Sequence, residues 1–143
     1  MSSTPSGLDQ VRATLHKAAA ASQRSAEDIT LVAVSKTKSA QDILSVLDAG
    51  HRVFGENRVQ EAEEKWPALK HRFSDVELHL IGPLQTNKVK SAVSLFDVIE
   101  SVDREKLARR LAEECKKQGR SLNVFLQVNT GEEPQKAGVP PRY

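Results

Sequence analysis

The sequence predicts a parallel α/β fold, and three observations lead to this prediction. A short apolar run, a polar loop and an amphipathic helical pattern follow one another repeatedly along the chain. The clearest run, ITLVAV at residues 29–34, is apolar almost throughout, as is typical of a strand covered on both faces in a parallel sheet. The residues that end successive runs lie roughly 20 to 26 positions apart, which suits one strand plus its crossover helix. Those residues are Lys36, Asn57, Gly82, Asp103 and Asn129.

The first unit shows the pattern in most detail. Residues 29–34 are expected to form a strand in which Val34 is buried. Ser39 and Asp42 stand at N-cap and N3 spacing before an apolar helical face, and Gly50 stands where a glycine commonly follows a helix. The unit is therefore predicted to be strand, loop and helix.

The later units repeat this order, and a helix at about residues 8–22 precedes them all. In the second unit Asn57 is a candidate helix cap and Pro67 is expected to end the helix. In the fourth unit Asp103 is the expected N-cap and Gly119 the expected stop. The remaining strands are predicted at residues 52–55, 77–81, 97–102 and 122–128, with a further helix near residues 87–96.

Strands that alternate with helices indicate a parallel sheet, which either stays open or closes into a barrel. A complete (β/α)₈ barrel needs about 250 residues, so this chain supplies about five of the eight units. We therefore expect one incomplete β/α-barrel domain over residues 1–143, with an open sheet as the alternative. In both architectures ligands bind at the carboxyl ends of the strands, so the polar residues there are the candidates for function.

The composition argues against several classes of function. The 21 basic and 19 acidic residues leave a net charge of +2, which does not indicate nucleic-acid binding. The single Cys115 and the four scattered histidines match neither a disulfide framework nor a metal site. No signal peptide, membrane span, glycine-rich nucleotide loop, serine-hydrolase elbow or zinc-protease motif is recognised. A small-molecule partner and a cytoplasmic location are expected.

Lys36 is the strongest candidate for covalent chemistry. It follows Val32 and Val34 in strand alternation, so all three should share one face of the sheet, with the lysine at the functional end. A lysine amine beside an apolar wall can form a Schiff base with a carbonyl. On position alone, a solvated loop lysine is the more common outcome. Lys38 adds a second cation, which either favours an anionic ligand or is a loop charge.

Two further strand ends carry polar candidates. His79 shares a face with Ile81 and could stack on or hydrogen-bond to a ligand ring, or it could be a hydrogen-bonded core histidine. Asn57 could cap a helix, contact a ligand, or do both, because the two roles require the same place in the chain. In the fifth run Gln127 and Asn129 make one face polar towards its end.

Taken together, the strand ends resemble the pyridoxal phosphate homeostasis family, whose members have an alanine racemase-like barrel. The resemblance is carried by VAVSKTK at residues 32–38, FGENRVQE at 54–61 and HLIGPLQTNK at 79–88. ESVDR at 100–104 and QVNTGEEPQKAG at 127–138 extend it over most of the chain. Arg58 and Leu78 depart from the family pattern, in which a tyrosine and an aromatic residue often stand at these positions.

The resemblance implies the single-domain barrel of fold-type III pyridoxal phosphate proteins. It makes Lys36 the Schiff-base lysine, places Asn57 and His79 around the cofactor, and matches Lys38 and Lys136 to lysines linked to cofactor handling. The implied function is intracellular homeostasis of pyridoxal 5'-phosphate rather than turnover, in a full-length protein expected to be monomeric. The family continues through three more strands, whose loops usually hold the phosphate. This shorter chain is therefore expected to bind cofactor weakly and to self-associate.

The sequence leaves three other interpretations open. A pyridoxal phosphate-dependent racemase needs a second acid/base, and neither the terminal Tyr143 nor Cys115 in a predicted helix is well placed to supply it. An aldolase-like barrel would use Lys36 on a sugar, and the absence of yellow colour would favour it. A truncated chain without any activity is the third interpretation.

Overall fold

The fold is built on one parallel sheet whose strands follow the order of the sequence. The computed structural model describes residues 6–142, in which the strands are β1 (Ala33–Val34), β2 (Val53–Glu56), β3 (Glu77–Leu80), β4 (Val98–Val102) and β5 (Asn123–Leu126). Each strand pairs in parallel with the next, in the order β1-β2-β3-β4-β5. Sequential parallel strands of this kind form part of a β/α barrel, as the sequence predicted.

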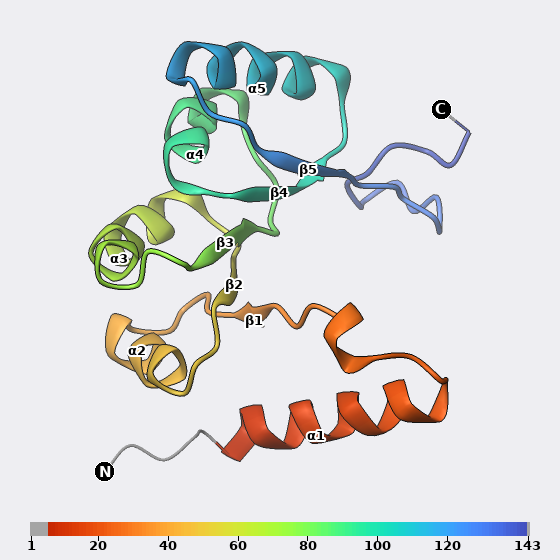
Figure 1. Cartoon of the computed structure of the whole chain (residues 1–143). Coiled ribbons are helices and arrows are strands. Elements are labelled where there is room, and N and C mark those ends of the chain that lie inside the picture. Colours follow the sequence, from red (N-terminus) through yellow and green to blue (C-terminus); the bar gives the residue numbers. More distant parts are fainter. Residues whose placement is uncertain (1–5, 143) are drawn as a thin grey trace.

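Helices connect the strands and cover one side of the sheet. They are α1 (Ser6–Ala21), α2 (Ala40–Asp48), α3 (Val59–Arg72), α4 (Val89–Leu95) and α5 (Glu105–Gln118), with short 3₁₀ turns η1 (Ala26–Asp28) and η2 (Thr86–Lys88). The sheet is curved, α2 to α5 lie along its convex side, and α1 lies beyond β1 (Figure 1). Within residues 6–142 no helix is both long enough and apolar enough to cross a membrane.

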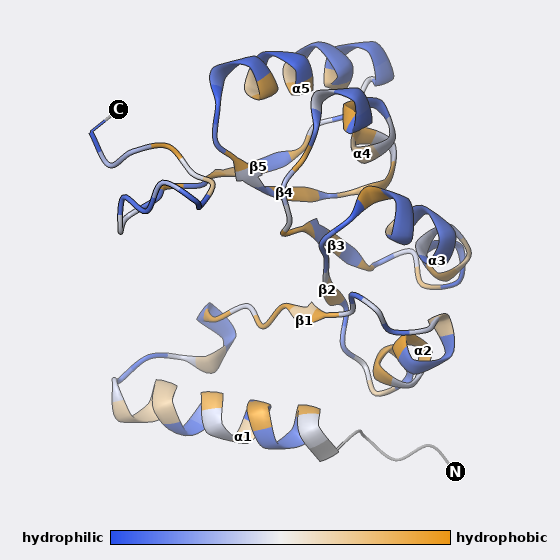
Figure 2. Cartoon of the chain, turned by 180° about the vertical axis from the view of Figure 1, so that it is seen from behind, coloured by the Kyte–Doolittle hydropathy of each residue, from blue (hydrophilic) through white to orange (hydrophobic). Residues whose placement is uncertain are grey.

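The core lies between the sheet and the helices on its convex side. Phe54, Leu78 and Leu80 point outward from their strands and are fully buried with Trp66 of α3. The Phe54 and Trp66 rings lie 5.0 Å apart between centroids. Figure 2 shows the apolar colour on β1 and on parts of β4, and the hydrophilic colour over most of α5. Burial of each such side chain stabilises the fold by about 1.5–3 kcal/mol, so this layer holds the strands and helices together.

The first predicted strand is shorter in the structure than the sequence suggested. Residues 26–28 form η1, and regular pairing with β2 is confined to Ala33 and Val34. Val34 is 50% exposed, so the expectation that it is buried was wrong. It pairs with Gly55, whereas Ala33 pairs with the core residue Phe54, so Val34 faces the concave side of the first strand of the sheet. The adjacent residue Ala33 points to the other face and packs against the core.

The helix boundaries confirm two predictions and correct three. Ser39 caps α2 by accepting a hydrogen bond from the Asp42 amide, and Gly119 ends α5 in the left-handed conformation. Pro67 does not end α3, which continues to Arg72, because the buried Trp66 and Leu69 anchor that helix to the core on both sides of the proline. The N-caps of α3 and α5 are Arg58 and Arg104, so Asn57 and Asp103 are not the caps that were predicted.

Candidate functional site

The candidate site residues follow the strands at the carboxyl edge of the sheet. Lys36 stands two residues beyond the end of β1, and Asn57 directly follows β2. His79 lies within β3, one residue before its end. Because parallel strands end at the same edge, these three positions come from three neighbouring strands of one sheet.

The strand register relates these positions to one another. Val34 pairs with Gly55, and Gly55 pairs with His79, so the three residues form one row across β1, β2 and β3. Lys36 and Asn57 follow Val34 and Gly55 by two residues, in a turn after β1 and a bend after β2, at the carboxyl edge of the sheet. The strand ends therefore bring the sequence candidates Lys36 and Asn57 to the edge of the sheet next to the row that contains His79.

The concave face at this row is apolar and closely packed. A side chain at Gly55 would lie 3.0 Å from a methyl group of Val32 and 3.2 Å from one of Ile81, so these two residues converge over the glycine. Val34 at one end of the sheet and Phe125 at the other are each about half exposed. The face thus offers apolar surface on both sides of His79.

His79 is buried and oriented by an acidic partner. Its side chain is 6% exposed, and its Nδ1 lies 2.6 Å from Glu100 Oε2 of β4. The Phe125 ring stands edge-on to the imidazole, at 6.5 Å between centroids. Nε2 lies 3.3 Å from a Glu77 carboxylate oxygen, without the geometry of a hydrogen bond. One ring nitrogen is therefore fixed by Glu100, and the other is left for a further partner.

Asn57, directly after β2, lies against Gly82 in the loop after β3. A side chain at Gly82 would meet the Asn57 carbonyl oxygen at 2.3 Å and its carbonyl carbon at 2.9 Å. Only glycine permits this approach. Asn57 also lines a cleft of about 520 Å³ with Gln85 and Lys88, between the start of α3 and the loop after β3.

The structure places the two other predicted lysines apart from this row. Lys38 lines a shallow groove between β1 and α2, together with Asp42 and Ile43. Lys136 is exposed in the loop after β5, where its amine pairs with Glu133 at 3.0 Å. The Asn129 side chain organises that loop through hydrogen bonds to the Glu133 backbone at 2.8 and 3.2 Å. The roles predicted for Lys38 and Lys136 remain predictions.

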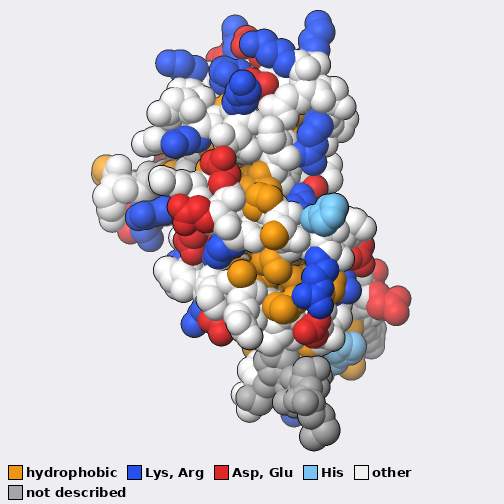
Figure 3. Space-filling model, turned by 90° about the vertical axis from the view of Figure 1, so that its left-hand side faces the viewer, with side chains coloured by type: hydrophobic (Ala, Val, Ile, Leu, Met, Phe, Trp, Pro, Cys, Tyr) orange, Lys and Arg blue, Asp and Glu red, His pale blue; other side chains and the backbone are white. Residues whose placement is uncertain are grey.

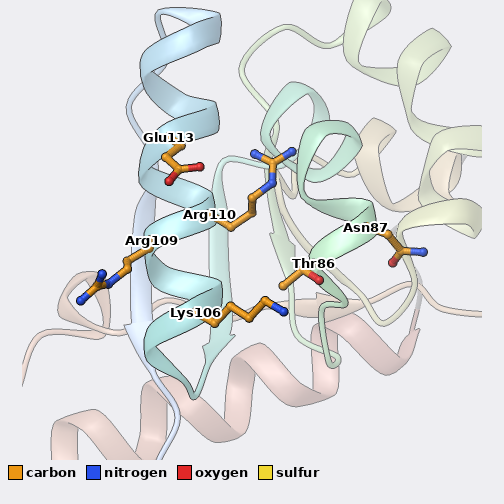
Figure 4. A pocket seen from close by; sticks show the side chains of 6 residues that line it. All are labelled: Thr86, Asn87, Lys106, Arg109, Arg110 and Glu113. Atoms are coloured by element: carbon orange, nitrogen blue, oxygen red, sulfur yellow. The ribbon is translucent and has the colours of Figure 1, made fainter.

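A second cluster of polar residues lies between η2 and α5, on the outside of the sheet (Figure 4). Lys106, Arg109 and Arg110 line this pocket of about 500 Å³, which lies within a basic region at the α5 end of the molecule (Figure 3). Arg109 pairs with Glu105, and Arg110 pairs with Glu114 at 3.3 Å. These cations are partly neutralised within their own helix, so the pocket has the character of a solvated basic surface.

Sequence reasoning did not identify the acidic residues that support the site. Glu56 is fully buried on the helix side of β2, and Glu100 holds His79 from β4. Each carboxylate interrupts an otherwise apolar strand, which was the available signal. Glu61 and Lys65 of α3 stand four residues apart, and their contact with Glu56 and the Lys36 loop depends on the fold.

Comparisons with known proteins give a consistent result. The model of the alanine racemase N-terminal domain matches residues 8–143. The pyridoxal phosphate homeostasis protein of Escherichia coli K12 is 42% identical over 136 residues, which cover 92% of this chain and 57% of that protein. The corresponding protein of Pasteurella multocida is 39% identical, with 94% and 58% covered. The chain thus spans somewhat more than half the length of these relatives.

Solved structures agree with the sequence relatives. PipY of Synechococcus elongatus, in a structure with pyridoxal phosphate bound, is 41% identical and superposes with a TM-score of 0.75 over 90% of this chain and 58% of its own. An unknown protein from Bifidobacterium adolescentis, in a crystal structure, is 32% identical, with a TM-score of 0.88 over 95% of this chain and 58% of its own. The chain therefore belongs to the family of the alanine racemase N-terminal domain.

Proposed function

We propose that this chain binds pyridoxal 5'-phosphate on the concave side of its sheet and that Lys36 forms the Schiff base. One observation carries the proposal: Lys36 lies in the turn two residues beyond Val34, which shares a row with Gly55 and His79, in a chain 41% identical to a protein whose structure contains this cofactor. Lys36 is exposed, and among residues 6–142 its amine has no hydrogen bond or ion pair. The amine is therefore free to react.

The residues around Lys36 fit the ring and aldehyde of this cofactor. The bound cofactor would supply an aldehyde, whose carbon forms a C–N bond with the lysine amine while its oxygen leaves as water. Val34 and Phe125 offer apolar surface suited to a flat ring. His79 Nε2 is a buried polar atom without a hydrogen-bond partner, directed by Glu100 on the opposite nitrogen, and suits a polar substituent.

The role that we propose is cofactor binding and homeostasis in the cytoplasm, without turnover. Racemisation would require a second acid or base on the opposite face of the cofactor. Among residues 6–142 the concave rows contain no tyrosine or cysteine, and Cys115 lies in α5 on the convex side. Lys38 and Lys136 would assist in transfer of the cofactor to and from Lys36.

The test is to identify the lysine that reacts. Incubation with pyridoxal phosphate, reduction with borohydride and peptide mapping should yield a phosphopyridoxyl group on Lys36. Lys36→Ala should lose the visible absorbance band and keep its thermal unfolding temperature, because the exposed side chain contributes little packing. An adduct confined to Lys38, Lys88 or Lys136 would overturn the assignment. Loss of α-deuterium from alanine would show a racemase instead.

A further inference from the structure

The loop that carries Lys36 is held by a buried ionic cluster from the opposite side of the sheet. Glu56 of β2 points into the helix layer and is fully buried. Its Oε2 accepts hydrogen bonds from Ser35 Oγ at 2.6 Å and from Trp66 Nε1 at 3.0 Å, and lies 2.9 Å from Lys65 Nζ. Burying a carboxylate costs free energy unless it is paired and hydrogen-bonded. Glu56 therefore holds Ser35, Trp66 and Lys65 close to its carboxylate group.

Lys65 extends the cluster to the loop backbone. Its amine donates to the carbonyl oxygen of Ser35 at 2.9 Å and to that of Lys38 at 3.0 Å. These two carbonyls flank the Lys36–Thr37 pair, so one ammonium group fixes both ends of the segment that bears the candidate lysine. The Lys65 side chain is only 11% exposed, and its charge is therefore weakly screened by solvent.

Glu61 completes the cluster through the peptide that follows Lys36. Its Oε2 accepts from the Thr37 amide at 2.6 Å and from Lys65 at 2.9 Å. The hydrogen bond from Lys65 and that from the Thr37 amide lower the pKa of the Glu61 carboxyl. The carboxylate is thus charged at neutral pH and holds the Thr37 amide in place.

The backbone of Thr37 shows that the loop needs such support. Its φ is +62°, in the left-handed region that β-branched residues rarely adopt. A conformation of this kind persists only where surrounding contacts determine it. Besides the backbone hydrogen bond from Lys38 to Ser35 across the turn, the contacts with Glu61 and Lys65 supply this support.

We infer that Glu56, Lys65 and Glu61 are positioning residues that set the place of the Lys36 amine for reaction with the cofactor. The inference rests on the proposed function for its chemistry, while the fixed loop can be measured without any cofactor. The three residues act from the convex side and do not line the concave face on which the cofactor is proposed to bind.

The first measurement is hydrogen exchange in the cofactor-free chain. Lys65→Met should speed exchange at the Thr37 amide at least tenfold, the factor that corresponds to 1.4 kcal/mol. Lys70→Met is the matched control, because Lys70 lies on the same helix and likewise joins a carbonyl (Leu95, 2.8 Å) to a carboxylate (Asp97, 3.0 Å). It should leave exchange at residues 35–38 unchanged.

The second measurement is the rate at which borohydride traps pyridoxal phosphate on Lys36. Lys65→Met should slow the reaction at least tenfold, whereas Lys70→Met should not, even if both lower stability equally. Lys65→Met leaves the buried Glu56 carboxylate without its cation, which can unfold the chain, so Glu61→Ala serves as a second variant on a less buried side chain. Compared with Glu61→Ala, Glu61→Gln should restore part of the rate, because it keeps an acceptor for the Thr37 amide.

The outcomes separate the two proposals. Unchanged exchange at Thr37 in both Lys65→Met and Glu61→Ala overturns the inference. Faster exchange with an unchanged trapping rate also overturns it, because the cluster would then be structural only. A native chain that gives no adduct on Lys36 refutes the proposed function, and the exchange experiment still decides whether the cluster fixes the loop.

Discussion

The close approach of β2 and β3 predicts a strong effect of Gly82→Ala. The added methyl group would lie 2.3 Å from the Asn57 carbonyl oxygen, whereas such contacts stay beyond 3.0 Å, so the two backbones must separate by about 0.7 Å. Gly82 is buried and Asn57 is half-buried, and the Asn57 atoms that the methyl group would meet belong to the main chain, so they cannot rotate away as the end of a side chain can. Overpacking of this kind costs roughly 1–3 kcal/mol.

The measurement combines urea unfolding with a cofactor titration. We expect Gly82→Ala to lose 1–3 kcal/mol of unfolding free energy, as is typical of overpacked sites. Pyridoxal phosphate affinity, followed by visible absorbance, should fall at least tenfold, because Asn57 moves relative to Lys36. Gly55→Ala provides a graded comparison: its contacts at 3.0 to 3.3 Å are with side-chain methyl groups of Val32 and Ile81, which can adjust. It should cost less than Gly82→Ala.

Gly131→Ala is the neutral control, because the nearest atom to its new methyl group is the end of the Glu133 side chain at 3.4 Å. If Gly82→Ala is as stable as Gly131→Ala and binds cofactor like the native chain, then the strand ends are not rigidly set. The expectation that the close packing of Asn57 on Gly82 sets the position of Asn57 relative to Lys36 would then be refuted.

Three further predictions follow from other contacts. Burial lowers the pKa of His51, whose Nδ1 lies 2.9 Å from Arg12 of α1, so the folded state binds fewer protons than the unfolded chain. The stability of the fold should therefore fall as the pH drops below 6.5, the ordinary pKa of histidine. Thermal unfolding across pH should show a smaller loss in His51→Gln. Trp66→Phe removes a hydrogen-bond donor to the buried Glu56, so the free energy of urea unfolding should fall by about 1.5–3 kcal/mol. A loss below about 0.5 kcal/mol would contradict a structural role for that hydrogen bond. Leu126 is 61% exposed on the last strand of the sheet, so Leu126→Lys should reduce self-association in sedimentation experiments; if the native chain is monomeric, the expectation of self-association is wrong.

The order of the elements was predictable because it depends on local patterns. Ser39 and Gly119 mark helix ends through their own backbone and side-chain chemistry, and both predictions were confirmed. Pro67 was predicted to end a helix by the same local logic and did not, because burial of Trp66 and Leu69 outweighs the local cost. Tertiary packing thus overrode the propensity of a single residue.

The site was only partly predictable, for a related reason. Strand parity was enough to suggest that Lys36 and Val34 share a face, but it did not show that this face is exposed in the chain. The partners of Glu56 come from the residue after β1 and from α3, and no spacing rule brings Ser35, Lys65 and Trp66 to one oxygen atom. Such a contact set becomes visible only when the helix layer is packed on the sheet.

The segment FGEN at residues 54–57 shows how one strand supports both sides of the site. Gly55 lies under the apolar concave face, and Asn57 meets Gly82 at the carboxyl edge, while Glu56 points away into the helix layer. A buried ion pair is weak evidence for stability, because apolar residues of similar volume often serve equally well. The geometry of the Glu56 cluster is better explained by the loop that it holds, since its hydrogen bonds fix Ser35, Thr37 and Lys38 on both sides of Lys36. We therefore expect substitutions in α3, behind the sheet, to alter the reactivity of Lys36 without contacting the proposed cofactor site.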